Sequence, residues 1–487
     1  MKIGIHKQWP LVILGFLLVP LFYINVSNTH DWGDDFAGYL HQAKNITQGI
    51  PQNQTGYIVN DDYPTYAPAS YPSGFPLLLS IVYLLFGGKI IFFKFYINCF
   101  LFAFLLLVFY FLRRKTETIN AFLLTLIVAY NPWMLNFKAE IMSDIPFAFL
   151  MLAITYLILS ARQQSLYVNV LTGLMTGLLI SIRNIGIVIP ITLMLHVLYN
   201  LMTGRKKEAI TVRSSAIISV LAILIYVLLD KAIFPQTGHG LFAYSYIFDL
   251  NRLGHFLLTN TAYYFAVFRA FFEPWNGDWQ FAAILCGTMG FSMTIIGIIK
   301  KWSTDFSFID LLVIAYLAVI IVYPYTSAGF RFLLPIAPFL LHYLFLGIRS
   351  LNLELNVRPK ILSLILTAFV FLSYQQGWRE LANAPSVVTG PQQNANADAF
   401  QWIKEQTGNE AVFCFAKPRA LSFYTNRPAM TVAPDADEAQ IRNNLIKYNV
   451  DYVMTNKDES GEHIMNYVKG LRLVWHNDLN SIYEVRN

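Results

Sequence analysis

Three aspartates stand close together in the stretch HDWGDDFAGYLHQAKNI, where Asp31, Asp34 and Asp35 fall within five positions. No lysine or arginine stands directly beside them, and only 13% of the whole chain is charged. A carboxylate that is partly withdrawn from water holds its proton more tightly and can serve as a general base. The alternative is structural, because aspartate is also a favoured cap for a helix that begins near Phe36. The cluster therefore predicts either a catalytic base or a helix cap.

Other charged residues stand at the ends of apolar segments, where a membrane makes them costly and marks them as functional candidates. They are Glu140, Asp144, Arg183, Arg269, Glu273, Asp278 and Arg331. Arginines can hold a phosphate through paired hydrogen bonds, and tyrosines and tryptophans, whose faces commonly stack on sugar rings or isoprenoid chains, crowd the same segment ends. The combination suits a polar substrate carried on a lipid phosphate. An aromatic belt with interfacial ion pairs is the alternative.

Composition indicates a polytopic α-helical membrane protein. The chain has 487 residues, of which 56% are hydrophobic, and its mean hydropathy is +0.47. A soluble globular chain is about 25% charged, roughly twice the value found here. The net charge of +6 fits basic cytoplasmic loops, so we predict no nucleic-acid partner. The three cysteines form no CxxC motif, and we predict no zinc site.

Eleven segments are long and apolar enough to predict membrane-spanning helices. They lie near 8–25, 89–112, 119–137, 145–161, 166–182, 184–202, 211–231, 279–299, 307–324, 332–349 and 360–377. With a cytoplasmic N-terminus, every basic cluster falls in a cytoplasmic loop, and the C-terminus lies outside. The ten apolar residues from Leu77 to Phe86 are too few to span and suit an interfacial or re-entrant helix.

Two external pieces follow from this topology: a first loop, 26–88, and a tail, 378–487. The tail alternates predicted helices near 395–407, after Pro418 and near 436–447 with the strands AVFCF, VDYVMT, LRLVW and SIYEV. Such alternation favours a small α/β domain. It has no glycine-rich phosphate loop, so we expect a lid or docking module. The predicted domains are therefore a transmembrane domain, 1–377, and an extracytoplasmic domain, 378–487.

Four stretches in a fixed order resemble the GT-C class of integral-membrane glycosyltransferases. They are DDFAGYLHQA, YPSGFPLLLSIVYLLFG, SIRNIGIVIP and RFLLPIAPFL. The similar families are the family 39 protein mannosyltransferases and the bacterial aminoarabinose transferases that modify lipid A. In these families an Asp-(Asp/Glu)-x-x-Tyr run in the first external loop carries the catalytic base. Asp35, four positions before Tyr39, fits that spacing best, with Asp34 as the alternative. The chain has no lysine near YPSGFP, where the aminoarabinose enzymes place one.

The resemblance implies an enzyme that transfers a hexose or pentose from a polyprenyl-phosphate donor to a lipid, glycan or protein acceptor, with inversion. It implies no cofactor, and a divalent metal is left open. We predict that Arg331 contacts the lipid phosphate, with Arg183 and Arg269 as alternatives. Tyr39, Tyr71 and Glu273 are predicted to line the substrate site. The expected location is the bacterial inner membrane. A flippase or other carrier of lipid-linked sugars, and an inactive scaffold of the same fold, are the alternatives.

Overall fold

The structure is a computed structural model, and it describes residues 9–64, 66–160, 165–204, 211–234, 249–272, 280–323, 329–355, 359–383 and 390–485. The chain forms two compact units. Unit 1 contains residues 1–26, 94–227 and 245–385, and unit 2 contains residues 27–93, 228–244 and 386–487. The first external loop and the tail, which are far apart in the sequence, therefore belong to one unit.

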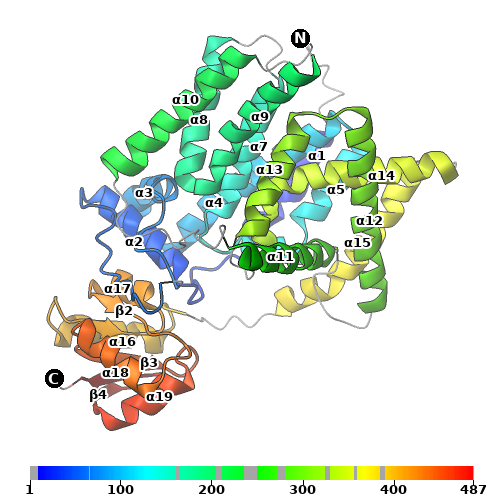
Figure 1. The fold of residues 1–487 in the computed structure, drawn as a ribbon. Coiled ribbons are helices and arrows are strands. Elements are labelled where there is room, and N and C mark those ends of the chain that lie inside the picture. Colours follow the sequence, from blue (N-terminus) through cyan, green and yellow to red (C-terminus); the bar gives the residue numbers. More distant parts are fainter. Residues whose placement is uncertain are drawn as a thin grey trace. The chain divides into compact units, whose positions relative to one another are not determined.

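Unit 1 is helical throughout its described residues (Figure 1). Its helices are α1 (Trp9–Leu18), α4 (Ile90–Arg113, which begins in unit 2), α5 (Thr118–Ala129), α6 (Pro132–Phe137), α7 (Asp144–Ser160), α8 (Leu166–Ile182), α9 (Val188–Thr203), α10 (Val212–Val227), α11 (Leu250–Ala270), α12 (Gln280–Thr304), α13 (Phe308–Val322), α14 (Ala337–Leu355) and α15 (Pro359–Asn383). Short 3₁₀ turns are η2 (Val19–Phe22), η3 (Asn184–Ile187), η6 (Gly329–Phe332) and η7 (Leu334–Ile336).

Small residues let α8 and α10 pack closely, side by side (Figure 1). A Cβ atom on Gly173 would lie 2.7 Å from Cβ of Leu221, and one on Gly177 would lie 2.5 Å from Cβ of Ile225. The two glycines are four positions apart, so they face α10 together. This spacing is a common device for packing helices in membranes, where lipid provides no hydrophobic force between them.

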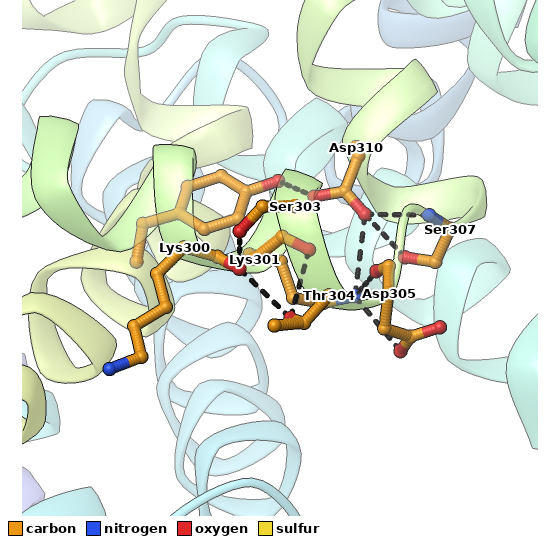
Figure 2. Close-up of polar contacts among 8 residues, drawn as sticks. Lys300, Lys301, Ser303, Thr304, Asp305, Ser307 and Asp310 are labelled. Atoms are coloured by element: carbon orange, nitrogen blue, oxygen red, sulfur yellow. Dashed lines mark hydrogen bonds and ion pairs between the residues drawn. The ribbon is translucent and has the colours of Figure 1, made fainter.

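A buried carboxylate ties α12, α13 and α14 together (Figure 2). Asp310 accepts hydrogen bonds from the backbone N–H and the hydroxyl of Ser307, both at 2.7 Å, and so closes the capping box that starts α13. Its other oxygen accepts a hydrogen bond from the hydroxyl of Tyr343 at 2.6 Å. Lys301 lies 3.5 Å from the same carboxylate. The carboxylate is therefore fully buried but well satisfied.

Helices form at each predicted span, but two details of the prediction were wrong. The segment 119–137 is two helices, because Asn131 caps α6 through Trp133 N and Met134 N and Pro132 follows it. The predicted span 211–231 matches the helix Val212–Ile233, whose last residues, Leu228–Ile233, are π-helical. Helix α11 was missed because its polar residues interrupt the apolar run that the prediction required. The predicted separation of the spans 166–182 and 184–202 is confirmed, because Arg183 is extended between α8 and η3.

Three helices of the described residues are long and apolar enough to cross a membrane: Ile90–Arg113, Asn184–Thr203 and Val212–Ile233. Several others are apolar but shorter. The count of eleven spans and their orientation remain predictions.

Unit 2 begins with two helices of the first external loop, α2 (Asp35–Thr47) and α3 (Gly74–Phe86), which pack on each other. The predicted helix at Leu77–Phe86 is confirmed as part of α3. Its outer side carries exposed apolar residues such as Leu84 and Leu85, 74% and 67% exposed. Such a surface fits the predicted interfacial position.

The tail contains a five-stranded sheet, which confirms the prediction of sheet structure in a small C-terminal region (Figure 1). Its strands are β1 (Phe413–Cys414), β2 (Ala429–Met430), β3 (Tyr452–Asn456), β4 (Arg472–His476) and β5 (Asn480–Glu484). The order is β2-β1-β3-β5-β4, with β2, β1 and β3 parallel and β5 antiparallel to both β3 and β4. The helices are α16 (Asn394–Gln406), α17 (Pro418–Thr425), α18 (Glu438–Lys447) and α19 (Glu462–Tyr467). The predicted tail elements are confirmed, and β2 and α19 were missed.

The first external loop also adds to this sheet. Tyr57 forms a parallel bridge with Ala429 at the β2 edge. The Ile58 N–H donates to the Ala429 carbonyl at 2.8 Å, and the Ala429 N–H donates to the Gly56 carbonyl at 2.9 Å. Asn60 extends the contact by donating to the carbonyl of Thr431 at 3.0 Å. The loop and the tail are therefore built as one body.

Helix α2 buries a histidine against α17. His41 is 6% exposed and lies edge-on to the ring of Phe423, with the centroids 5.7 Å apart. Burial, together with the charge of Lys44, lowers the pKa of His41 to about 3. This imidazole is therefore neutral in the folded protein at neutral and mildly acidic pH.

Candidate active site

Asp34 is held by three donors within unit 2. Its Oδ2 accepts from Arg419 Nε and from the hydroxyl of Tyr66, each at 2.9 Å. Its Oδ1 accepts from the backbone N–H of Ala420 at 2.9 Å. Asp34 precedes α2, but its side chain makes no capping hydrogen bond, so the capping alternative is wrong for this residue. Its φ of +38° is strained for a residue other than glycine, at a cost of order 1–3 kcal/mol.

Asp35 shares the same arginine but is more accessible. Its Oδ1 accepts from Arg419 Nη2 at 2.6 Å and from the hydroxyl of Tyr71 at 2.8 Å. The side chain of Asp35 is 34% exposed, whereas that of Asp34 is 5% exposed. A carboxylate that accepts a proton from a substrate must be reachable, and of the two only Asp35 has this exposure.

Arg419, in the first turn of α17, is the centre of the cluster. Its side chain is 4% exposed, and Nη1 donates to the hydroxyl of Tyr71. Gly38 of α2 admits it, because a Cβ atom at Gly38 would lie 3.3 Å from Cδ of Arg419. Burial alone would lower the pKa of the guanidinium, but Tyr71 and the two carboxylates raise it well above its usual value.

Aromatic rings surround this arginine. Its Cζ lies 5.2 Å from the ring centroid of Tyr71, 5.8 Å from that of Tyr57 and 5.9 Å from that of Tyr66. At such distances the ring faces attract a cation. Burial raises the pKa of both the Tyr66 and the Tyr71 hydroxyl well above its usual value. These phenols therefore stay protonated and act as donors to the carboxylates.

Two of the predicted substrate-binding tyrosines are packed together. Tyr39 stacks on Tyr71, with the centroids 4.1 Å apart, and lies edge-on to Phe75 at 4.8 Å. Tyr39 is 6% exposed. The pair supports the hydroxyl that contacts Asp35. The spacing of four residues between Asp35 and Tyr39 thus places both on the face of α2 near Tyr71.

Arg419 is the residue that sequence reasoning missed. It lies 384 positions from Asp35, in the tail, where no single arginine stands out. Its local signal is the run KPRALSFY, in which an arginine follows a proline at the start of a short helix. The partners of the three aspartates could not be found from neighbours in the sequence. Asp31, the third of them, is 58% exposed and pairs with His30 at 3.0 Å.

In unit 1 the structure brings together two of the predicted phosphate contacts. Arg183 Nη1 donates to Asp144 Oδ1, and Arg331 Nη2 donates to Asp144 Oδ2 at 3.2 Å. Asp144 is 2% exposed, whereas the side chains of Arg183 and Arg331 are 21% and 32% exposed. The guanidinium of Arg183 also lies over the ring of Phe332, 5.1 Å from its centroid. Asp144 therefore holds two partly exposed arginines close to one another.

The other predicted substrate contacts are placed differently. Arg269, in the last turn of α11, packs against Gly287 of α12, where a Cβ atom would lie 2.4 Å from its Cγ. Its role in phosphate binding remains a prediction. Glu273 lies outside the described residues.

No protein-family model matches this sequence, and no curated protein matches it either. Solved structures do. ArnT from Cupriavidus metallidurans bound to undecaprenyl phosphate is similar over 98% of this chain and 98% of its own, with a TM-score of 0.56 and 11% identity. The archaeal oligosaccharyltransferase AglB from Archaeoglobus fulgidus, in complex with an inhibitory peptide and a dolichol-phosphate, is similar over 93% of this chain and 70% of its own. Its TM-score is 0.58 at 15% identity. A second AglB structure, in complex with Zn and sulfate, has a TM-score of 0.61 at 15% identity.

Both proteins are GT-C glycosyltransferases. The resemblance seen in the sequence is therefore confirmed at the level of the fold, over nearly the whole chain.

Proposed function

We propose that this protein is an integral-membrane glycosyltransferase that moves a sugar from a polyprenyl-phosphate donor to an acceptor on the extracytoplasmic face, with inversion. The observation that carries the proposal is the likeness to ArnT along the full length of both chains. That structure contains undecaprenyl phosphate and the AglB structure contains a dolichol-phosphate. Because both similar structures contain a polyprenyl-type phosphate, we propose a lipid-linked sugar phosphate as the donor of this chain. The bacterial inner membrane and an external C-terminus are part of the same proposal.

Asp35 is the proposed general base. Its exposure of 34%, against 5% for Asp34, supports this choice. In the reaction an acceptor hydroxyl or amine gives its proton to the carboxylate while its oxygen or nitrogen attacks the anomeric carbon. The bond between that carbon and the phosphate oxygen breaks, and the lipid phosphate leaves. General base catalysis of this kind contributes typically 10²–10⁴-fold.

Arg419, Tyr71 and Asp34 have supporting roles in this scheme. Arg419 and Tyr71 fix one oxygen of Asp35, and a cation beside a carboxylate favours its charged form. The two donors therefore hold the carboxylate in one orientation. Asp34 is too deeply buried to act on a substrate, and it anchors the guanidinium.

Arg183 and Arg331 are the proposed contacts of the donor phosphate. Each is partly exposed and each is oriented by Asp144, which leaves part of each guanidinium accessible to an anion. Guanidinium groups match phosphate oxygens geometrically, and lysine would replace them only in part. We assign no residue to a metal. One AglB structure contains Zn, whereas the scheme proposed for this chain uses no metal.

The experiment is turnover of a labelled polyprenyl-phosphate sugar in proteoliposomes, with an extract of cell-envelope glycans and lipids as acceptor. Asp35→Asn keeps the shape and one oxygen of the side chain but cannot take up a proton, so transfer should fall by about 10²–10⁴-fold. Wild-type protein should release free polyprenyl phosphate. If it moves the intact lipid-linked sugar between leaflets instead, the chain is a carrier. Full transfer by Asp35→Asn would refute the assigned base.

A further inference from the structure

Unit 2 contains a cavity of about 420 Å³ that plays no part in the chemistry described so far. Its lining comes from the segments that directly follow the three parallel strands: Phe415–Lys417 after β1, Val432 after β2 and Glu459–Ile464 after β3. Tyr63 and Tyr66 of the first external loop complete the wall. The cavity therefore lies at the carboxyl edge of the parallel part of the sheet.

The strand order makes this a place where ligands are expected. From β1 the chain crosses to β2 on one side, and from β3 it continues to β4 on the other side. The connections after β1 and β3 thus leave in opposite directions from neighbouring strands. In open α/β sheets, ligands bind in the crevice outside the carboxyl ends of strands at such a switch point. The volume also falls in the range of about 300–1,000 Å³ that is usual for small-molecule sites.

The lining chemistry argues against an anionic ligand. Glu459 and Glu462 contribute two carboxylates, and the cation in the lining, Lys417, is already paired with Glu459 at 3.0 Å. The chain after β1 and β3 has no glycine-rich phosphate loop. A phosphate or a nucleotide would therefore meet negative charge. A ligand rich in hydroxyl groups would instead find carboxylate acceptors, the hydroxyl of Thr431 and the imidazole of His463.

Two tyrosine rings provide the apolar side of the site. Tyr63 and Tyr66 lie with their centroids 5.6 Å apart and are tilted by 51°. Aromatic rings beside carboxylates suit a sugar, since its C–H faces pack on rings and its hydroxyls donate to acid groups. The mixed lining therefore fits an uncharged sugar ring better than a lipid chain or an ion.

Tyr66 also connects the cavity to Asp34, which is held by the same arginine as the proposed base, Asp35. Its hydroxyl lies 2.9 Å from Asp34 Oδ2 and 2.9 Å from the carbonyl of Ala416, while its ring lines the cavity. One tyrosine thus separates the cavity from the carboxylate pair. We infer that the cavity is the acceptor subsite and binds an uncharged sugar ring of a glycan acceptor. This inference rests on the proposed function, because only a transferase has an acceptor.

The test measures binding without turnover. Full-length protein in nanodiscs, free of sugar-based detergent, is mixed with the methyl glycosides of glucose, galactose, mannose, arabinose and rhamnose. Saturation-transfer NMR then reports which of them bind. We expect at least one glycoside to show a saturation-transfer signal with the wild-type protein. Its affinity should fall roughly 10-fold or more in Glu462→Gln, the loss expected when a hydrogen bond to a charged group is removed, and also in Tyr63→Ala.

Glu405→Gln is the matched control, because it removes an exposed carboxylate from α16 outside the cavity. It should bind the glycoside like the wild type. Absence of saturation transfer from the wild-type protein to any of the five glycosides would overturn the inference. Unchanged glycoside binding in both cavity variants would also overturn it. The same holds if the protein gives a saturation-transfer signal with a serine- and asparagine-containing peptide but with none of the glycosides.

Asp35→Asn separates this inference from the proposed function. That variant should bind the glycoside normally and fail in sugar transfer. If it binds normally and also transfers normally, the base assignment fails while the subsite stands. If it fails in transfer while the cavity variants bind like the wild type, the subsite fails and the base stands.

Discussion

Replacing Arg419 by alanine should show whether this residue supports the proposed base, Asp35, in addition to stabilising the fold. The substitution removes the donors at 2.9 Å from Asp34 and at 2.6 Å from Asp35. Asp34 is 5% exposed and would keep only Ala420 N–H and the Tyr66 hydroxyl. Breaking a buried pair by removing one partner costs about 3–5 kcal/mol. Asp35 can be solvated, and Asp34 keeps two donors, so we expect the lower end, about 3 kcal/mol.

Lysine at this position should rescue part of the loss. Its ammonium keeps the charge but is a single point, whereas the guanidinium reaches Asp34 through Nε and Asp35 through Nη2. We expect Arg419→Lys to lie between the wild type and the alanine variant in stability. Because only one carboxylate can be paired at a time, transfer should be less well restored than stability.

Arg427 provides the control for burial of an arginine in the same unit. It is 6% exposed, and its described partners are hydroxyl and carbonyl oxygens, among them the carbonyls of Lys404 at 3.0 Å and Thr407 at 2.9 Å. Arg427→Ala should destabilise by a comparable amount, about 1.5–3 kcal/mol. It removes no cation from the carboxylate pair.

The assay combines hydrogen exchange with a pH profile of transfer. In full-length protein, exchange of peptides from α2 and α17 reports local opening. Losing a cation disfavours the charged form of a carboxylate, so the acidic limb of the transfer rate should move to higher pH in Arg419→Ala and stay in place in Arg427→Ala. In the double variant with Asp34→Asn, the buried charge is gone, and about 1–3 kcal/mol of the loss should return. An unmoved acidic limb, or no recovery in the double variant, would refute this account.

Three further predictions follow from the site, the buried histidine and the topology. Arg331→Ala should weaken binding of the polyprenyl-phosphate donor by about 10–150-fold, and unchanged binding in a flotation assay would exclude this contact. His41 has a folded pKa of about 3 against about 6.5 unfolded, so the unfolded chain binds more protons between these values and stability falls as pH falls. Between pH 7 and 4.5 the loss should be about 2.5 kcal/mol and should vanish in His41→Gln, as measured by denaturant unfolding of both proteins at the two pH values. Reporter fusions after Lys115 and Lys301 should be cytoplasmic and one after Asn487 external, and a cytoplasmic C-terminus would contradict the eleven-span topology.

Much of the helical architecture could be predicted because it depends on local signals. Gly408 and Pro418 mark the ends and starts of tail elements, and apolar length marks the helices of unit 1. Helix α11 escaped because tertiary packing, and not a continuous apolar run, accounts for it. Strand β2 escaped because it has two residues, Ala429 and Met430, and exists through its pairing with β1 and with the first external loop.

The candidate site was predictable only on one side. The carboxylates stand out by their density in a charge-poor chain, and Asp35 could be selected by its spacing to Tyr39. Arg419 could not be selected from the sequence, because its contacts with Asp35 and Asp34 span 384 and 385 positions. The spacing favoured Asp35 over Asp34, but the sequence could not show that the two side chains are 34% and 5% exposed, because this difference depends on packing against α17.

The assembly of unit 2 from distant segments has a consequence for biosynthesis. Asp34 and Arg419 are 385 positions apart, so at about 5–20 residues per second roughly 20–80 s pass between their emergence from the ribosome. During that interval the first external loop has its carboxylates but lacks the edge of the sheet and the cation that complete it. A nascent chain can therefore insert its first helices before the proposed base, Asp35, has its arginine partner. Under the proposed function, synthesis of the tail is therefore a late step of activation, because the proposed base lacks its supporting cation until Arg419 has been made.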